Sequence, residues 1–318
     1  MQPIHAKNGV ARQHDNRLRV VYWGMLGQFS IPPLRALLDA GYDVCAVIVP
    51  AARVPFPATT PDLTELKPVS MPSLLPVVNP YLQKNIVQIA WERDIPVFEV
   101  RRLRSMTTLN MLRSLAPDVG CVACFSRLLP PHLLELPRHG FFNVHPSLLP
   151  AYRGPAPLFW TFRDNAAQGV SIHVMDETLD TGAVVAQASA TLPDGITGLE
   201  ADQLLATRGG QLLTGVLAAI QAGTLDRTPQ SQPGPFAPWP TVDDFAVSSG
   251  WSARRIFNFM RVTGEWAQPY PVAIAGQRFL LASALRYAAD ETLATPYQQL
   301  GHILRIQCNP GVLDAILA

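Results

Sequence analysis

The length, composition and charge of the chain exclude several classes of protein. The sequence has 318 residues, of which 48% are hydrophobic and 15% charged, so it can form two domains with a sizeable core. Its formal net charge is +1, so no overall field attracts nucleic acid or a membrane surface. Four cysteines are too few for a disulfide scaffold, and no apolar run is long enough to span a membrane. We therefore expect a cytoplasmic protein.

The spacing of cysteine and histidine gives no indication of a metal site. Cys121 and Cys124 form a C-x-x-C pair, but they lie in the apolar run 119–125, which predicts a buried strand. The seven histidines show neither H-x-x-H nor H-E-x-x-H spacing. We expect that the protein binds no metal.

The first part of the chain alternates apolar runs with amphipathic segments. The polar residues 1–17 are expected to form a flexible tail. Ser30 is expected to cap a helix that has prolines in its first turn and ends at Gly41. The alternation predicts a parallel sheet with helices on its faces. Strands are predicted at 18–23, 44–49, 96–100, 118–125 and 141–144, and further helices at 81–93, 106–115 and 131–136.

Proline interrupts the pattern at two places. Eight of the 31 positions in 50–80 are proline, which predicts a long irregular insertion without regular elements. Five prolines in 228–240 predict a stiff linker between a domain at 18–227 and a second at 241–318. In the last part of the first domain we expect a helix at 158–165, strands at 170–175 and 183–192, and a long helix at 199–222. In the second domain we expect a helix at 252–261 and a small β-barrel built from 271–275, 278–284, 301–307 and 311–317.

Two polar segments, 141–154 and 175–182, each follow or end a predicted strand. Asn143 and His145 have the same parity on their strand, so both side chains project to one side. Open α/β sheets bind ligands beyond the carboxyl ends of their strands, so Asp180 is expected to reach across and orient the His145 ring. His173, which stands between Ile172 and Val174, is interpreted as a structural residue.

These segments resemble a family signature. The residues N-V-H-P-S-L-L-P-A-Y-R-G at 143–154, followed by L-D-T-G at 179–182, are similar to the 10-formyltetrahydrofolate-dependent formyltransferases. The resemblance spans nearly the whole chain from Leu18, and within the family the chain is most similar to the methionyl-tRNA formyltransferases. It implies an α/β fold in which a Rossmann-like domain with a mostly parallel sheet precedes a small OB-like β-barrel.

The resemblance also implies roles for particular residues. Asn143, His145 and Asp180 would be catalytic, and 10-formyltetrahydrofolate would be the formyl donor. Chemistry agrees, because the amide can donate to the oxyanion and the imidazole can take the proton of the attacking amine or, when protonated, stabilise the oxyanion. Gly27 and Arg153 would contact the amine acceptor. The implied donor contacts are Cys124, Phe125, Ser126, Leu128, Ser147, Leu148, Leu149, Pro150, Asp176 and Glu177.

Charge leaves the amine acceptor open. Residues 50–80 hold two cations and two acids, and residues 241–318 hold six arginines and six acids, so neither region has the uncompensated charge that grips RNA phosphates. The acceptor is therefore either initiator methionyl-tRNA or a smaller amine, such as a nucleotide-linked amino sugar or a biosynthetic amino acid. Two rival interpretations are a formyltetrahydrofolate hydrolase and a non-catalytic folate-binding protein. The absence of G-x-G-x-x-G argues against a nicotinamide cofactor.

Overall fold

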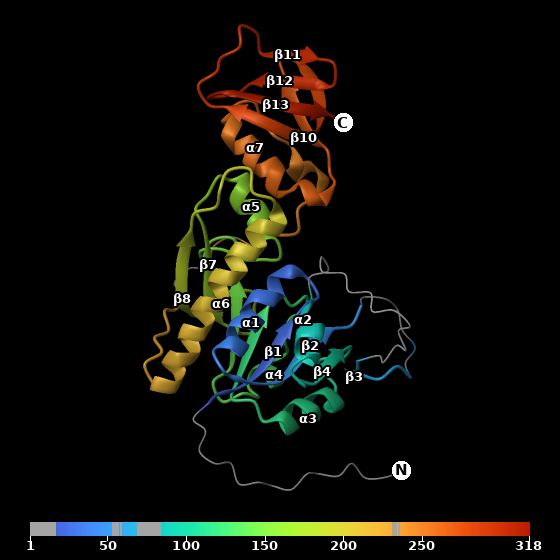
Figure 1. The fold of residues 1–318 in the computed structure, drawn as a ribbon, viewed down its shortest axis with the longest axis vertical. Helices are drawn as coiled ribbons and strands as arrows, with labels where there is room; N and C mark the ends of the chain where they lie inside the picture. Colours follow the sequence, from blue (N-terminus) through green and yellow to red (C-terminus); the bar gives the residue numbers. More distant parts are fainter. Residues whose placement is uncertain (1–16, 53–56, 58, 69–83, 231–233, 235) are drawn as a thin grey trace.

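The computed structural model describes residues 17–52, 57, 59–68, 84–230, 234 and 236–318, and these form two β-sheets with their own helices (Figure 1). The first sheet has eight described strands in the order β3-β4-β2-β1-β5-β6-β7-β8. Strands β4, β2, β1, β5 and β6 run parallel, whereas β3, β7 and β8 are antiparallel to their neighbours. The strands are β1 (Arg19–Gly24), β2 (Asp43–Pro50), β3 (Leu63–Leu66), β4 (Val97–Val100), β5 (Val119–Ala123), β6 (Phe141–His145), β7 (Gln168–Val174) and β8 (Val184–Ala190).

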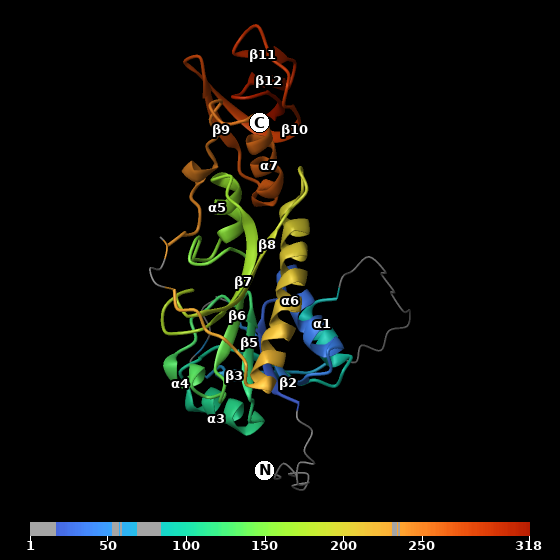
Figure 2. The same cartoon turned by 90° about the vertical axis from the view of Figure 1, so that its left-hand side faces the viewer.

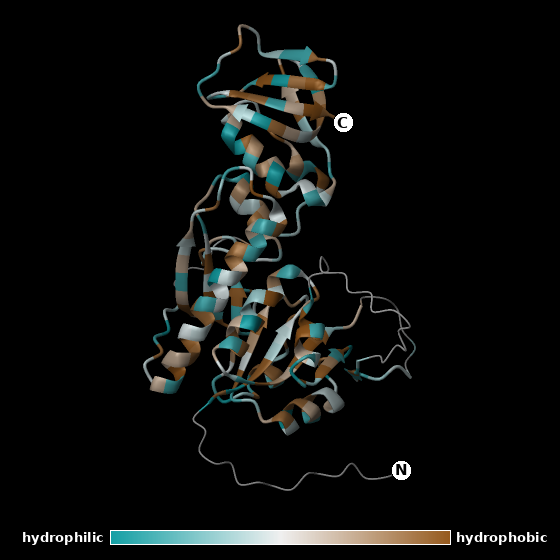
Figure 3. Cartoon of the chain, viewed as in Figure 1, coloured by the Kyte–Doolittle hydropathy of each residue, from teal (hydrophilic) through white to brown (hydrophobic). Residues whose placement is uncertain are grey.

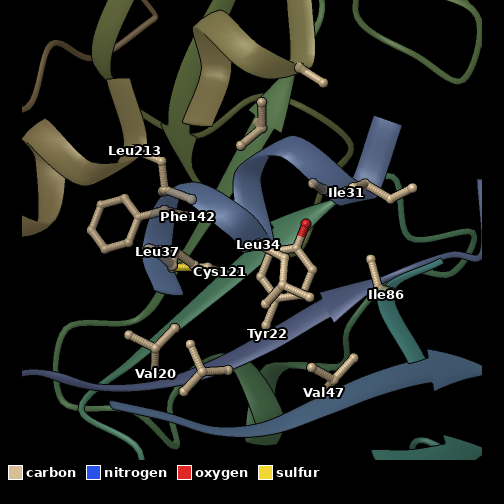
Figure 4. Close-up of a cluster of buried hydrophobic side chains, with 14 of the residues drawn as sticks. Val20, Tyr22, Ile31, Leu34, Leu37, Val47, Ile86, Cys121, Phe142 and Leu213 are labelled. Atoms are coloured by element: carbon tan, nitrogen blue, oxygen red, sulfur yellow. The ribbon is translucent and has the colours of Figure 1, made fainter. Parts of the chain in front are cut away.

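Alternate side chains of the first sheet enter two separate cores. On β1, Val20 and Tyr22 join one apolar cluster, and Val21 and Trp23 join the other. The first cluster packs under α1 (Ile31–Asp39), α2 (Ile86–Trp91) and α6 (Gly198–Ala222), as Figure 4 shows for α1. The second packs under α3 (Met106–Leu115) and α4 (Pro131–Leu134). Each fully buried large aliphatic or aromatic side chain contributes roughly 1.5–3 kcal/mol to folding, so this layered arrangement carries much of the stability.

The start of α1 differs from the prediction in one detail. Ser30 does precede the helix, as the last residue of the short 3-10 turn η1 (Gln28–Ser30), but its hydroxyl makes no capping hydrogen bond. Pro32 and Pro33 occupy the positions whose N–H groups a cap would bind, and proline has no N–H. The Ser30 hydroxyl instead donates to the Ala123 carbonyl at 2.7 Å and accepts from Met25 N at 3.0 Å. It thereby ties the turn after β1 to the end of β5.

The prediction that 50–80 contains no regular element is wrong. Strand β3 pairs antiparallel with β4, and Trp91 Nε1 donates to the Leu66 carbonyl at 2.9 Å. The two prolines nearest to β3 stand on either side of it, at 61 and 68, where no ladder N–H is lost. Residues 53–56, 58 and 69–83 lie outside the described residues, as do 1–16 of the predicted tail.

The second sheet has five described strands in the order β11-β12-β13-β10-β9, all antiparallel. They form an open half-barrel against α7 (Ala253–Val262), and the core of this part also takes Phe159 from α5 (Pro157–Arg163). Figure 3 shows hydrophobic residues on β12 and β13, whereas β11 is largely hydrophilic. The fold class expected from the sequence is confirmed, although β11 had not been predicted. The strands are β9 (Tyr270–Ile274), β10 (Gln277–Ala288), β11 (Tyr297–Leu300), β12 (Ile303–Gln307) and β13 (Val312–Leu317).

The chain after α6 returns along the first sheet before it enters the second (Figure 2). Gly223 ends the helix in the left-handed conformation with φ of 69°. Thr228 then forms an antiparallel bridge with Val184 of β8. The predicted stiff linker therefore contacts the edge of the first sheet. None of the helices among the described residues is long and apolar enough to cross a membrane.

Candidate active site

The two polar segments meet on the face of the first sheet rather than at its carboxyl edge. Strand β7 is antiparallel to β6, so its end lies beside the start of β6, where Met175 N donates to the Phe141 carbonyl at 2.8 Å. The β7–β8 loop then folds back over β6 and brings Asp180 to His145. The expectation of two neighbouring strand ends is corrected in this respect, because it did not take the antiparallel direction of β7 into account.

Asn143 and His173 lie directly opposite each other on β6 and β7. Phe142 and Val144 enter the α1–α6 core, so Asn143 and His145 leave β6 on the opposite face. The Asn143 Nδ2 atom lies 3.1 Å from His173 Nε2, and His173 Nδ1 lies 3.0 Å from the Val174 carbonyl. A carbonyl accepts only, so Nδ1 carries the proton of the neutral ring and Nε2 accepts from the Asn143 amide. This pairing fixes which way the Asn143 NH2 group points.

His145 is buried between a carbonyl and a carboxylate. Its Nε2 donates to the Tyr152 carbonyl at 3.0 Å, and its Nδ1 lies 3.7 Å from Asp180 Oδ2. Burial lowers the pKa of His145. The Asp180 charge acts against this and His173 adds to it, and the pKa stays below its ordinary value. The neutral ring therefore dominates at pH 7, and its unprotonated nitrogen is Nδ1. A proton arriving there would be stabilised by the Asp180 charge.

Asp180 stands in the left-handed region with φ of 57°, which is uncommon for a residue with a side chain. Gly182 allows the loop to close, because a Cβ there would lie 1.8 Å from the Val174 carbonyl oxygen. The Asp180 carboxylate accepts from Gly154 N at 2.9 Å, and its other oxygen lies 3.4 Å from His173 Nε2. Burial alone would raise the pKa of Asp180, but His145, His173 and the Gly154 N–H together lower it to about 2.

The four side chains form one connected group that can assist attack on a carbonyl. Asn143 uses one N–H for His173 and keeps a second for a developing oxyanion. His145 can accept a proton, and the ionised Asp180 stabilises the imidazolium that results. Sequence reasoning placed His173 in the core, and it is buried there, with 2% of its surface exposed. Its contacts to Asn143 and Asp180 were missed, because single apolar neighbours on a strand do not reveal what lies across the ladder.

The residues predicted to bind the donor occupy three neighbouring loops. Cys124 follows β5 with φ of 60°, and Phe125 packs edge-on against Trp23 with ring centroids 5.0 Å apart. Leu128 is 56% exposed, and Asp176 and Glu177 are also exposed. Ser126 is half-buried. The structure thus leaves Cys124, Leu128, Asp176 and Glu177 accessible.

Residues 147–150 make their contacts within their own turn and with the neighbouring strands β7 and β8. Ser147 is fully buried, and its hydroxyl donates to the Ala151 carbonyl at 2.8 Å. Leu149 is also buried, and its backbone N–H donates to the Ser171 hydroxyl at 3.1 Å. Leu148 is half-buried against Gly169, whereas Pro150 is exposed.

The two residues predicted to bind the acceptor differ in their surroundings. Gly27 is exposed in the turn after β1, with no atom within 4 Å of a Cβ built on it. Arg153 Nε donates to the Gly234 carbonyl at 2.9 Å, so part of its guanidinium group anchors the returning chain. No group of three or more His, Cys, Asp or Glu suited to a metal ion occurs among the described residues.

Comparison with known proteins decides the family. A family described as "Formyl transferase" matches residues 73–217. The methionyl-tRNA formyltransferase of Pelotomaculum thermopropionicum is 32% identical over 250 residues, which cover 78% of this chain and 73% of that protein. The chain belongs to the formyltransferase family. The methionyl-tRNA formyltransferase of Acidobacterium capsulatum is also 32% identical, over 290 residues that cover 89% of this chain and 86% of that protein.

Solved structures agree on the fold. The N-formyltransferase from Helicobacter canadensis, in complex with folinic acid and dTDP-3-aminofucose, has a TM-score of 0.64 at 15% identity and covers 95% of this chain. The sugar 3N-formyl transferase WlaRD has a TM-score of 0.61 at 14% identity and covers 94%. Each match extends over nearly all of the solved chain, 99% and 97% respectively. The resemblance seen in the sequence is confirmed, and the protein is an enzyme that transfers a formyl group.

Proposed function

We propose that this formyltransferase moves the formyl group of 10-formyltetrahydrofolate to the α-amino group of methionyl-tRNA, with Asn143, His145 and Asp180 as its catalytic residues. The observation that carries the proposal is the buried contact group in which Asp180 faces His145 at 3.7 Å and His173 joins Asp180 to Asn143. The relatives that share about a third of its residues are named for this acceptor.

The proposed reaction needs no covalent enzyme intermediate. The acceptor nitrogen attacks the formyl carbon, and the carbonyl electron pair moves to oxygen, where the free Asn143 N–H donates to it. His145 takes the proton that the nitrogen loses, and Asp180 stabilises the imidazolium. The tetrahedral carbon then releases the folate nitrogen, and His145 returns its proton to that leaving group. Such proton transfer is worth roughly 100- to 10,000-fold in rate.

The loops beside this group suit the folate donor. Leu128 and Leu179 expose apolar surface at 56% and 37% on the β5–α4 and β7–β8 loops. Flat aromatic rings such as a pterin bind to apolar surface of this kind, with a few polar groups fixing their orientation. The backbone at Cys124 and the exposed Asp176 and Glu177 supply such groups nearby in the same loops.

The identity of the acceptor is tested by comparing formyl transfer to different amines. Formyl transfer from 10-formyltetrahydrofolate is measured with initiator methionyl-tRNA and, in parallel, with a panel of nucleotide-linked amino sugars and free amino acids. The proposal expects kcat/KM for the tRNA to exceed that of every small amine. Transfer to a sugar amine alone would overturn the choice of acceptor and leave the catalytic group intact.

A small amine remains the second candidate because of charge. The ionisable residues of 241–318 cancel, so this region has no excess of cations for phosphates. Salt separates the two: a tRNA acceptor held by about three phosphate contacts loses roughly 10-fold or more of its affinity between 50 and 200 mM salt. A flat response of kcat/KM to salt supports the small amine.

A further inference from the structure

The chain between the two sheets makes its contacts at the catalytic loops. Thr228 exchanges two backbone hydrogen bonds with Val184, each of 2.9 Å. Gln230, Gly234 and Ala237 follow and also contact the loops around Asp180 and Arg153. We call Thr228, Gln230, Gly234 and Ala237 the interdomain clamp. The segment 228–240 that carries the clamp has five prolines, which indicates stiffness, and a stiff segment can hold a loop that it touches.

Gln230 grips the backbone of the loop that carries Asp180. Its Nε2 donates to the Asp180 carbonyl at 3.0 Å and to the Gly182 carbonyl at 2.7 Å. Both partners are acceptors only, so the orientation of the amide is fixed. The Gln230 Oε1 atom is buried without a hydrogen-bond partner among the described residues. A buried unpaired acceptor is costly, so the two bonds that Nε2 donates are the favourable contacts of this side chain. The two bonds hold the backbone at Asp180 and two residues after it, and the left-handed backbone of Asp180 aims the carboxylate at His145.

The clamp holds the second loop as well. Arg153 Nε donates to the Gly234 carbonyl at 2.9 Å, and Ala237 N donates to the Arg153 carbonyl at 2.7 Å. The backbones at Gly154 and Ala237 approach so closely that only glycine fits at 154, because a Cβ there would lie 2.1 Å from the Ala237 carbonyl oxygen. Gly154 N in turn donates to Asp180 at 2.9 Å, and the Tyr152 carbonyl accepts from His145. The same segment therefore fixes both hydrogen-bonding neighbours of the His145–Asp180 pair.

We propose that Gln230 is a positioning residue for formyl transfer, which sets the Asp180 carboxylate relative to His145 from the chain between the two sheets. The inference rests on the catalytic role of Asp180 proposed above. The carboxylate and imidazole are 3.7 Å apart, so their interaction depends on loop position rather than on a direct bond. A misplacement of about 1 Å in such a group can cost up to 100-fold in rate.

Gln230→Met tests this, since methionine keeps the length and loses both donors. We expect kcat to fall about 10- to 100-fold, with KM for donor and acceptor nearly unchanged. Gln230→Lys restores a donor for the two carbonyls and should recover most of the rate, whereas Gln230→Glu, which presents only acceptors, should not. The matched control is Gln299→Met, because Gln299 also donates to a backbone carbonyl, that of Gly301 at 3.2 Å, on the exposed strand β11.

A pH profile separates positioning from stability. Asp180 raises the pKa of His145, while burial and His173 lower it, so a displaced Asp180 should move the acid limb of kcat to lower pH. A merely structural role for Gln230 would lower the melting temperature and leave that limb in place. Wild-type kcat and an unshifted limb in folded Gln230→Met overturn the proposal. If that variant does not fold, equal rates for Gln230→Lys and Gln230→Glu overturn it.

Asp180→Asn in the same assay distinguishes the two levels of the argument. Wild-type kcat in Asp180→Asn means that the catalytic assignment itself fails. Loss of kcat in Asp180→Asn together with unchanged Gln230 variants means that Asp180 is catalytic and that only the positioning role of Gln230 is wrong.

Discussion

Two buried aspartates, one in each sheet region, have opposite kinds of partner. Asp314 on β13 is 7% exposed and accepts from Arg286 Nε at 2.8 Å and Arg305 Nε at 2.9 Å. Asp180 is 5% exposed, but its partners are two imidazoles, with ring nitrogens at 3.4 and 3.7 Å. Arginine stays charged at all relevant pH, whereas histidine titrates near neutrality.

This difference separates holding a fold from moving a proton. A carboxylate paired with two guanidinium groups joins β10, β12 and β13 through one charge network. A carboxylate beside two imidazoles, with ring nitrogens at 3.4 and 3.7 Å, stabilises a proton when one arrives on His145. The cost is that the carboxylate is less well satisfied at rest, which the Gly154 N–H partly offsets.

The largest effect is expected for His145→Ala. Removing the ring takes away the group that accepts the proton of the attacking amine, so kcat for formyl transfer should fall about 100- to 10,000-fold. Steady-state formylation assays measure it, with circular dichroism to show that the variant is folded. Unchanged kcat would show that His145, and with it the charge of Asp180 beside it, has no part in the reaction.

Asp314→Asn should lower stability and spare activity. The exchange removes the charge that pairs with Arg286 and Arg305, and hydrogen bonds to charged groups contribute about 1.5–3 kcal/mol, so the free energy of unfolding should drop by about 2 kcal/mol. Denaturant unfolding measures this. A drop in kcat without loss of stability would contradict the assignment of Asp314 to the fold alone.

Acid should weaken the contribution of Asp180 to stability. Its pKa is about 2 in the folded protein, below the ordinary value of 3.8, so its stabilisation is present above 3.8 and is lost as pH falls through 2. The shift corresponds to about 2 kcal/mol. The difference in unfolding free energy between wild type and Asp180→Asn should shrink by that amount over this interval. A difference that stays constant with pH argues against the pairing with His145 and His173.

The smallest effect is expected for His173→Leu. Leucine fills the buried site but cannot accept from Asn143, so the amide loses its fixed orientation and kcat should fall about 10-fold, or about 1.4 kcal/mol in transition-state free energy. His173→Asn keeps an acceptor and serves as the partial rescue. Equal activity of the leucine variant and wild type would place His173 outside the reaction.

Periodicity predicted most of the elements, and local chemistry explains the exceptions. The helix at 106–115 matches α3, and the helix at 199–222 differs from α6 by one residue, because both have clear apolar stripes. Strand β3 was hidden by flanking prolines, and β11, Y-Q-Q-L, is too polar and exposed to look like a strand. The domain limits drawn at 227 and 241 stay predictions.

The site could be predicted only in part, because it depends on contacts across the sheet. Parity on β6 was enough to place Asn143 and His145 on one face. The meeting with Asp180 depends on the antiparallel direction of β7, and the roles of His173 and Gln230 depend on a ladder register and a returning chain. Those contacts join residues 30 to 50 positions apart, and no local pattern encodes them.

The most direct test compares Asp180→Asn with Asp314→Asn in one experiment, because the two exchanges are chemically identical and both sites are buried. Formyl transfer to methionyl-tRNA and denaturant unfolding are measured on both proteins. We expect Asp180→Asn to lose at least about 100-fold in kcat while it remains folded, and Asp314→Asn to lose stability with kcat near wild type. Equal kcat in the two variants would contradict the assignment of the Asp180 group as the catalytic centre.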